Sequence, residues 1–345
     1  MRTMIMGSGS LGIIIGACLS KAGVDVTLVD VMQDNVDALN TNGARVVGSL
    51  DMTVPVKACT PDRLEGLFDL VLLLTKRVHN PVSFPQVMAH IHETSIVAAM
   101  QNGVPEESVA EYFGEHRTIG CPVGLGATWL GPGVSESTSS YERLRDHAFE
   151  LGELNGSITP RLLEVQKILQ HVGAAHLLTN LIGARWSKLF INTTFSGMSA
   201  ALNCTYGDVL DDDTALYCAA RIGDELVRVA ESLGIRLEPM QGGNIADFKL
   251  VEPVNIPEKR AMYQTVFGPQ SRLKASMLQD MDKGRQTEVF FINGLVAEKG
   301  RKQGLATPFN DMVVALVRES EATKQLPTMS GNLERFKAIG ARPFV

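Results

Sequence analysis

The sequence predicts an α/β protein in which a domain built on a parallel sheet, residues 1–180, precedes an all-α domain, residues 181–345. Residues 69–75 and 95–100 are apolar runs of strand length, as in a parallel sheet that is covered on both faces. From Leu181 onward strand signals nearly vanish, and apolar residues recur at helical period. A chain of 345 residues is long enough for two such domains.

The first thirty residues read as strand, glycine turn, helix and strand. Gly7 allows a tight turn, Gly9 lets the backbone approach a pyrophosphate, and Gly12 lets the helix lie close to the sheet. A glycine string alone is a weak signal in a chain with 32 glycines, but this one lies between a strand and a helix, 18 residues before Asp30. We therefore expect a Rossmann-type dinucleotide-binding domain whose phosphate contacts come from Gly7, Ser8, Gly9, Ser10, Leu11 and Gly12.

Asp30, at the end of the second strand, indicates which dinucleotide is bound. A carboxylate there accepts hydrogen bonds from the adenosine ribose hydroxyls, whereas a 2′-phosphate would meet it as a like charge. Residues 31–34 supply no arginine or lysine to offset that repulsion. The residues themselves therefore favour NADH.

Composition excludes several classes of protein. A net charge of -6 and a pI near 5.7 give no basic surface for nucleic acid. Five scattered cysteines, never in a C-x-x-C pair, are typical of reduced thiols in a cytosolic protein. His90 and His92 form the one close histidine pair, and no cysteine or carboxylate cluster accompanies them, so no metal site is expected.

The amino-terminal segment faintly imitates a secretory signal, because Arg2 precedes an apolar stretch that ends at Cys18. Polar residues 7–10 interrupt that stretch where a signal needs it continuous. No apolar run reaches the roughly 18 residues that a membrane span requires. We expect a soluble, cytoplasmic protein without a membrane partner.

Periodicity and turn signals predict the remaining elements. In the first domain strands are expected at 44–47, 53–57, 118–123, 148–152 and 174–179, helices at 35–39, 85–91, 106–113 and 161–172, and an exposed hairpin or loop at 131–146. In the second domain helices are expected at 181–202, 214–233, 270–282, 285–303 and 308–323, irregular structure or short helices at 238–270, and a polar, lightly packed tail at 330–345.

Two polar residues follow buried strands of the first domain. Lys76 follows the strand at 69–75, and Asn102 follows the strand at 95–100. Ligands of open α/β sheets bind outside the carboxyl ends of the strands, which places both side chains at the cofactor edge. A solvated loop cation is an equally good interpretation of Lys76, and Asn102-Gly103 is also a common turn dipeptide.

The helix that opens the second domain carries Lys188, Asn192 and Ser196 at a spacing of four, which predicts one shared face. Their neighbours Leu189 and Phe195 are apolar, and no acid lies four residues from the lysine. Charges are seldom buried without a partner, so this lysine is a candidate catalytic group. The alternative is a lysine whose stem extends to water.

Ser276 and Glu288 are further candidates. Glu288 precedes the apolar run 289–292, so its carboxylate is expected to be only partly solvated. The alternatives are a first-turn acid favoured by the helix dipole and a serine that only hydrogen-bonds locally.

Taken together, these residues resemble the ketopantoate reductase (2-dehydropantoate 2-reductase) family. The resemblance covers nearly the whole chain in order, and it includes the glycine string, Lys76, Asn102-Gly103, Arg185-Trp-x-Lys188-x-x-x-Asn192, Ser276-Met-Leu-Gln-Asp280 and Thr287-Glu288-x-x-x-Ile292-Asn293-Gly294. The last two segments are its specific part.

The resemblance implies roles for individual residues. Lys188 would be the general acid that protonates the C2 oxygen as hydride arrives, and Asn102 would contact both the nicotinamide nucleotide and the substrate. Asn192 would bind the hydroxyl or carboxyl end of the substrate, and Ser276 its carboxylate. Glu288 would orient Lys188 or the cofactor ribose.

The chain also departs from the family pattern. Ser196 replaces a second substrate-binding asparagine, and the segments 131–147 and 240–270 are longer than in compact members. The family typically uses NADPH, which Asp30 disfavours, so the cofactor is expected to be NADH or NADPH.

The expected activity is reduction of a 2-oxo acid to a 2-hydroxy acid, ketopantoate to pantoate, as in pantothenate biosynthesis. One alternative is a related hydroxyacid, sugar-acid or polyol-phosphate dehydrogenase. Another is a non-catalytic redox sensor, against which the lysine, asparagine and glutamate argue. Helical second domains of this kind often pair, so a homodimer is expected, although no heptad indicates the pairing surface.

Overall fold

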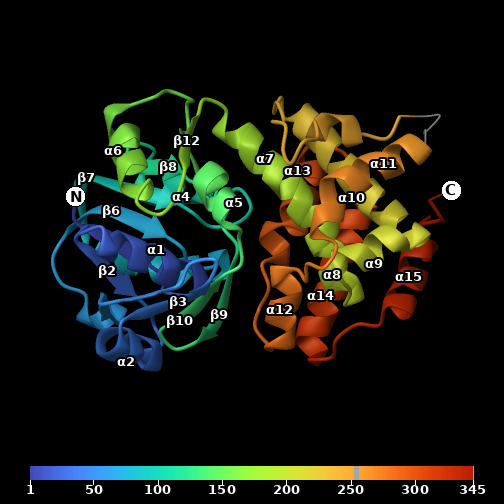
Figure 1. Ribbon diagram of the computed structural model, residues 1–345. Coiled ribbons are helices and arrows are strands. Elements are labelled where there is room, and N and C mark those ends of the chain that lie inside the picture. Colours follow the sequence, from blue (N-terminus) through green and yellow to red (C-terminus); the bar gives the residue numbers. More distant parts are fainter. Residues whose placement is uncertain (252–255, 345) are drawn as a thin grey trace. The chain divides into compact units, whose positions relative to one another are not determined.

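The computed structural model describes residues 1–251 and 256–344. The chain divides into two compact units (Figure 1). The first consists of Met1–Gln101 and Pro105–Leu181, and the second of Asn102–Val104 and Ile182–Val345. Three residues that follow a strand of the first unit therefore belong to the second.

An eight-stranded sheet forms the centre of the first unit, in the order β12-β11-β8-β7-β6-β1-β2-β5. Neighbouring strands are parallel except β11 and β8, which are antiparallel. The strands are β1 (Thr3–Met6), β2 (Val26–Val29), β5 (Lys57–Cys59), β6 (Phe68–Leu73), β7 (Ile91–Ala99), β8 (Thr118–Gly120), β11 (Phe149–Glu153) and β12 (Ala175–Leu178). The predicted α/β class with a largely parallel sheet is confirmed.

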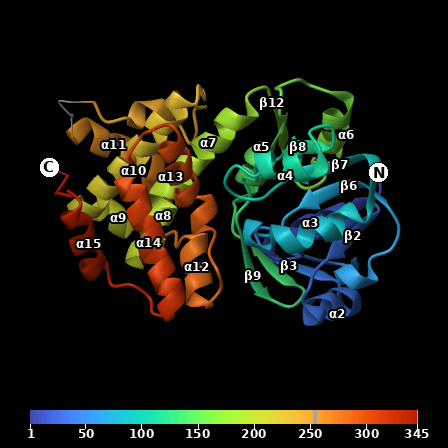
Figure 2. The same cartoon turned by 180° about the vertical axis from the view of Figure 1, so that it is seen from behind.

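Both faces of this sheet are buried, because alternate residues of its strands enter two separate cores. Ile5 and Leu72 pack with helices α1 (Ser10–Lys21) and α6 (Pro160–Leu169). Met4 and Leu73 pack on the opposite face with α3 (Asn80–Met88) and α4 (Glu106–Phe113). Figures 1 and 2 show these two faces from opposite sides.

A second, four-stranded sheet lies in the same unit, in the order β4-β3-β10-β9. Its strands are β3 (Ala44–Gly48), β4 (Met52–Val54), β9 (Ala127–Gly131) and β10 (Val134–Ser137). Residues 131–146 were expected to form an exposed hairpin or loop. The hairpin is present, but β10 pairs with β3, Ser135 and Ser137 are buried, and helix α5 (Tyr141–His147) follows.

Three further predictions in the first unit were wrong in their bounds. The helix expected at 85–91 is α3, which begins at Asn80 and ends before β7. Proline favours the first turn of a helix, and Pro81 rather than Pro85 occupies that position. The strand expected at 53–57 is split into β4 and β5, with Pro55 between them. Helix α2 (Gln33–Asn42) is longer than expected.

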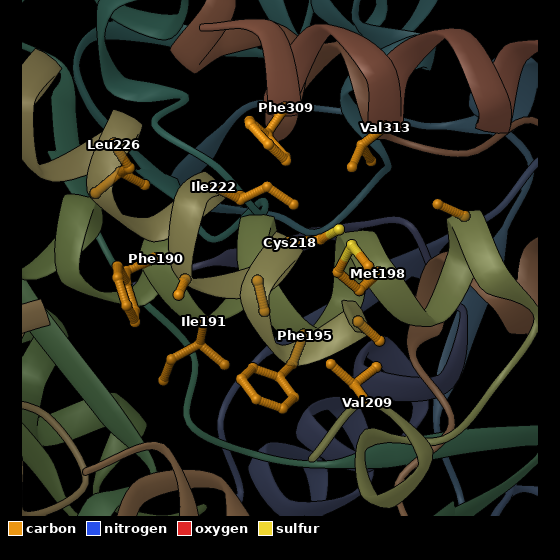
Figure 3. Packing of buried hydrophobic residues seen from close by; sticks show 14 of the residues in the cluster. Phe190, Ile191, Phe195, Met198, Val209, Cys218, Ile222, Leu226, Phe309 and Val313 are labelled. Carbon is orange, nitrogen blue, oxygen red and sulfur yellow. The ribbon is translucent and has the colours of Figure 1, made fainter. Parts of the chain in front are cut away.

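The second unit is helical. Its α-helices are α7 (Leu181–Ile191), α8 (Gly197–Leu202), α9 (Tyr206–Asp211), α10 (Asp213–Ser232), α11 (Ile256–Phe267), α12 (Ser276–Asp282), α13 (Asn293–Lys302), α14 (Pro308–Thr323) and α15 (Met329–Ala338). Its core gathers side chains from most of them, including Phe190, Phe195, Met198 and Val313 (Figure 3). Among the described residues no helix combines the length and the apolar character that crossing a membrane requires.

Parts of the second unit differ from expectation. The segment 238–270 contains the twelve-residue α11, and its residues 252–255 lie outside the described chain. The tail is not lightly packed: α15 is helical, and Phe336 and Phe344 are at most 1% exposed. Val345 lies outside the described residues. Residues 285–288 precede the helical turn at 289–291 instead of continuing a helix.

Candidate active site

The glycine turn joins β1 to α1, and two of its glycines are required by geometry. Gly7 has a φ of +107°, and a Cβ there would lie 2.8 Å from the Thr75 amide nitrogen. A Cβ on Gly12 would lie 2.2 Å from the Gly7 carbonyl oxygen. Side chains at either position would therefore force the turn open.

Gly9 is the N-cap residue of α1, and a Cβ added there would meet no atom within 4 Å. The space over this helix N-terminus is therefore open to a ligand, and the first turn of α1 carries no acidic residue. First-turn N–H groups and the helix dipole favour an anionic group at such a position. The residues present fit the pyrophosphate of a dinucleotide.

The other residues of the turn face inward. The Ser8 side chain is buried, and its hydroxyl donates to the Val29 carbonyl at 3.3 Å. The Ser10 carbonyl accepts a hydrogen bond of 2.8 Å from Ser135 on β10. Leu11 is partly buried against the core below. Ser8 thus stabilises the turn through its hydroxyl.

Asp30 is partly exposed at the end of β2. Its Oδ1 accepts from the Met32 amide at 3.0 Å, and its Oδ2 accepts from Asn35 Nδ2 at 3.3 Å. Asn35 is only 1% exposed, and the same Nδ2 donates to the Ser8 carbonyl at 3.0 Å, while its Oδ1 accepts from the Gly133 amide at 2.8 Å. One amide thus joins the glycine turn, the acid and the β9–β10 hairpin.

Asn35 was not predicted as a site residue. The signal was present in part, since α2 was expected to be amphipathic and Asn35 is a polar residue on its buried face. Its partners, however, lie 27 residues before and 98 residues after it. The periodicity of a sequence does not predict contacts between residues so far apart.

Lys76 lies at the carboxyl end of β6, as expected, where it is partly exposed and begins the short turn Arg77–His79. Gln101, which was also not predicted as a site residue, is buried at the same edge of the sheet. Its Nε2 donates to the Thr75 carbonyl and to Asn80 Oδ1, both at 2.7 Å. This edge of the sheet is therefore held by side-chain hydrogen bonds.

In the second unit the structure brings Asn102 and Glu288 together. Asn102 Nδ2 donates to Glu288 Oε2 at 3.3 Å, although 186 residues separate them. Glu288 is 7% exposed, so its carboxylate is largely withdrawn from solvent. The hydrogen bond orients the Asn102 amide and leaves its Oδ1 to accept from a ligand.

Lys188 and Asn192 are more exposed than the residues around them. Between residues 183 and 202 these two are partly exposed, and every other residue is buried. They lie one turn apart on α7 and at the beginning of the next segment. The ammonium and the amide therefore face the same side of an otherwise buried helix.

A π-helical turn, Asn192–Ser196, separates α7 from α8. Its hydrogen bonds span five residues instead of four. Ser196 is 6% exposed, and its hydroxyl lies 2.6 Å from that of Tyr206. Ser196 is therefore buried, unlike the partly exposed Lys188 and Asn192, and its part in substrate binding stays a prediction.

Ser276 is the exposed first residue of α12. The preceding amide, that of Ala275, donates to Ser199 Oγ on α8 at 3.3 Å, which fixes the start of α12 against that helix. A hydroxyl at a helix N-terminus suits a carboxylate ligand, since the dipole and the hydroxyl both favour negative charge.

Comparison with protein-family models accounts for most of the chain. Residues 3–154 match the family described as "Ketopantoate reductase PanE/ApbA", and residues 180–321 match its carboxyl-terminal part, "Ketopantoate reductase PanE/ApbA C terminal". The two matches together cover both units.

The chain belongs to the ketopantoate reductase family.

Relatives within this family match end to end. A 2-dehydropantoate 2-reductase of Streptococcus pyogenes is 28% identical over 330 residues, which cover 93% of this chain and 98% of that protein. The 2-dehydropantoate 2-reductase of Pyrococcus horikoshii is 27% identical, with the same coverage of both chains.

Solved structures of the ketopantoate reductase family have the same fold. The 2-dehydropantoate 2-reductase of Geobacter metallireducens is 26% identical with a TM-score of 0.78, over 93% of this chain and 100% of that one. D-mandelate dehydrogenase, solved with NADH and anilino(oxo)acetate, is 23% identical with a TM-score of 0.78, over 94% of this chain and 99% of that one. At 23% identity, the similarity to D-mandelate dehydrogenase shows only that the fold is shared.

Proposed function

We propose that this protein reduces a 2-oxo acid to a 2-hydroxy acid with a nicotinamide dinucleotide, and that the substrate is 2-dehydropantoate. The single observation that carries the proposal is Lys188, which with Asn192 is partly exposed within the otherwise buried segment 183–202. Full-length similarity to proteins named 2-dehydropantoate 2-reductase supports the choice of substrate.

The glycine turn and Asp30 are the residues that would hold the dinucleotide. Open space at Gly9 suits its phosphates, and the acid suits an unmodified adenosine ribose, which favours NADH over NADPH. When bound, the reduced nicotinamide supplies a hydride to the carbonyl carbon of the substrate. Lys76, at the carboxyl end of β6, is a further contact of the dinucleotide.

Lys188 performs two tasks in this proposal. Its ammonium stabilises the negative charge that develops on the C2 oxygen of the substrate, and it then donates a proton to that oxygen. The low exposure of its helix strengthens the first effect, since Coulomb interactions are stronger where water is excluded.

The remaining polar groups bind and orient. Asn192 hydrogen-bonds the hydroxyl or carboxyl end of the substrate, and Ser276 its carboxylate. Asn102, fixed by Glu288, presents its carbonyl oxygen to the cofactor and substrate. Ser196 is left out of this set, because its hydroxyl is buried against Tyr206.

Steady-state rates of nicotinamide oxidation test the proposal. 2-Dehydropantoate, 2-oxoisovalerate, pyruvate and benzoylformate are compared as substrates, each with NADH and with NADPH. We expect the highest kcat/KM with 2-dehydropantoate and NADH. Failure to reduce any 2-oxo acid, together with oxidation of a 3-hydroxy acid or a polyol phosphate, would establish the competing dehydrogenase class instead.

A further inference from the structure

The π-helical turn shifts the hydrogen bonding of one backbone amide, and a side chain from another helix bonds to the carbonyl that this amide would reach in an α-helix. In a regular α-helix the Gly197 N–H would bond to the Thr193 carbonyl, four residues back. Here that N–H donates to the Asn192 carbonyl, five residues back, and to the Thr194 carbonyl, three residues back. The Thr193 carbonyl accepts a hydrogen bond of 3.0 Å from Asn293 Nδ2, at the start of α13.

Asn293 is itself held by a chain of buried amides and one carboxyl group. The same Nδ2 donates to Asn310 Oδ1 at 3.0 Å, and Asn310 Nδ2 donates to Glu225 Oε2 at 2.8 Å. Glu225 also accepts from the backbone amides of Phe309 and Asn310, each at 3.0 Å. Asn293, Asn310 and Glu225 are at most 1% exposed, so α10, α13 and α14 jointly fix the amide.

Gly197 leaves room for this amide. A Cβ on Gly197 would lie 2.8 Å from Asn293 Oδ1, closer than real Cβ atoms approach. Gly197, which follows the π-helical turn, therefore needs to lack a side chain for Asn293 to pack against the turn.

We propose that Asn293 is a positioning residue. By stabilising the π-helical turn, it places the Asn192 amide beside Lys188, where that amide binds the substrate. This inference rests on the proposed function, in which Asn192 binds the 2-oxo acid.

Loss of the Asn293 amide would leave the buried Thr193 carbonyl without this partner, which is unfavourable. The turn would then relax toward α-helical hydrogen bonding, in which Gly197 donates to Thr193. Phe195 and Met198 downstream are fully buried in the core (Figure 3). The change of register would therefore fall mainly on the partly exposed Asn192.

The test compares Asn293→Leu with a matched control. In wild type, Asn332 Nδ2 donates to the Ala201 carbonyl, at the far end of α8, at 2.6 Å. The control Asn332→Leu removes this hydrogen bond. For Asn293→Leu we expect the KM for the 2-oxo acid to rise by about tenfold, the effect of one lost polar contact. Both kcat and the Kd for NADH should change less than about threefold, and the control should keep the wild-type KM.

A double variant separates positioning from general destabilisation. If Asn293 acts through Asn192, then Asn192→Ala combined with Asn293→Leu should have the KM of Asn192→Ala alone. A KM that rises by the product of the two single effects would overturn the inference, as would a wild-type KM in Asn293→Leu. Gly197→Ala disturbs the same contact from the opposite side and must reproduce the rise in KM, even if Asn293→Leu does not fold.

Amide hydrogen exchange of residues 190–200 gives a readout that needs no substrate. Exchange should be faster in Asn293→Leu than in wild type and unchanged in Asn332→Leu, and equal exchange in all three would contradict the inference. If wild type reduces no 2-oxo acid, the proposed function fails, while exchange still tests the turn. If wild type is active but the variants behave alike, the inference alone fails.

Discussion

Gly9 stands at the N-cap of α1 with open space where a side chain would project. Its φ of -72° is one that alanine adopts, so Gly9→Ala should fold with the thermal stability of wild type. The methyl group would obstruct the approach of phosphates, and we expect the Kd for NADH, measured by calorimetry, to rise by at least about tenfold. Gly268→Ala, also in open space, is the control. Equal affinity in both variants would contradict a phosphate site at Gly9.

Asp30 is held by the Met32 amide and by Asn35, so its carboxylate has a defined position. Asp30→Ser removes the like charge that a 2′-phosphate would meet. The ratio of kcat/KM for NADH to that for NADPH should therefore fall by about tenfold or more. Asp34→Ser makes the same change of charge at an exposed position on α2 and should leave the ratio unchanged.

Single residues were predicted from sequence where their chemistry is local. The glycine turn and Asp30 follow from one contiguous segment, and Lys188 from its contrast with apolar neighbours. Asn35 and Asn293 could not be found in this way, because each acts through partners 100 or so residues distant along the chain. Their function is defined by packing, which the local pattern does not contain.

At the scale of elements, the junction of α10, α13 and α14 predicts a dependence of stability on pH. Burial raises the pKa of Glu225 from its ordinary value of 4.5 to about 7, opposed by the hydrogen bonds from Phe309 and Asn310 and by Arg221. Between these values the folded protein keeps a proton that the unfolded chain has lost. Stability should therefore fall as pH rises from about 5 to about 7, by up to roughly 1.4 kcal/mol per pH unit.

Urea unfolding of wild type and Glu225→Gln across this pH range measures the effect. The glutamine cannot titrate, so the difference in unfolding free energy between the two proteins should change with pH and then level off near pH 8. A difference that stays constant from pH 5 to pH 8 would show that Glu225 keeps its ordinary pKa.

Element types were predictable where periodicity was long, and element ends where turn residues were unambiguous. Helices α4 and α14 have the predicted bounds. The π-helical turn could not be foreseen, because a spacing of four looks the same until the hydrogen bonds shift by one residue. α3 was misplaced for a different reason, since Pro81 and Pro85 both suit a first turn.

At the scale of the whole chain, the carboxyl-terminal residues close the second unit. The Phe344 amide donates to the Asp213 carbonyl at 3.0 Å, the Phe344 carbonyl accepts from Arg260 at 2.6 Å, and the ring is 1% exposed. Phe344→Ala should therefore lower the unfolding free energy by about 3 kcal/mol, as for other buried phenylalanines. Exposed Phe290 offers the control, and denaturant unfolding should show little change for Phe290→Ala.

The tail was expected to be polar and lightly packed, and the burial of Phe336 and Phe344 was not predicted. The division into two units was easier to foresee, since strand signals vanish near residue 181. The assignment of Asn102–Val104 to the second unit was not, because these residues follow directly from β7.

The most direct test of the proposed chemistry is the turnover number of Lys188→Ala with saturating 2-dehydropantoate and NADH. Loss of a positioned proton donor should lower kcat by about 10²–10⁴-fold, with the Kd for NADH unchanged. Lys167→Ala, at an exposed position on α6, should turn over like wild type. A kcat for Lys188→Ala within about twofold of wild type would contradict the assignment of this ammonium as the proton donor.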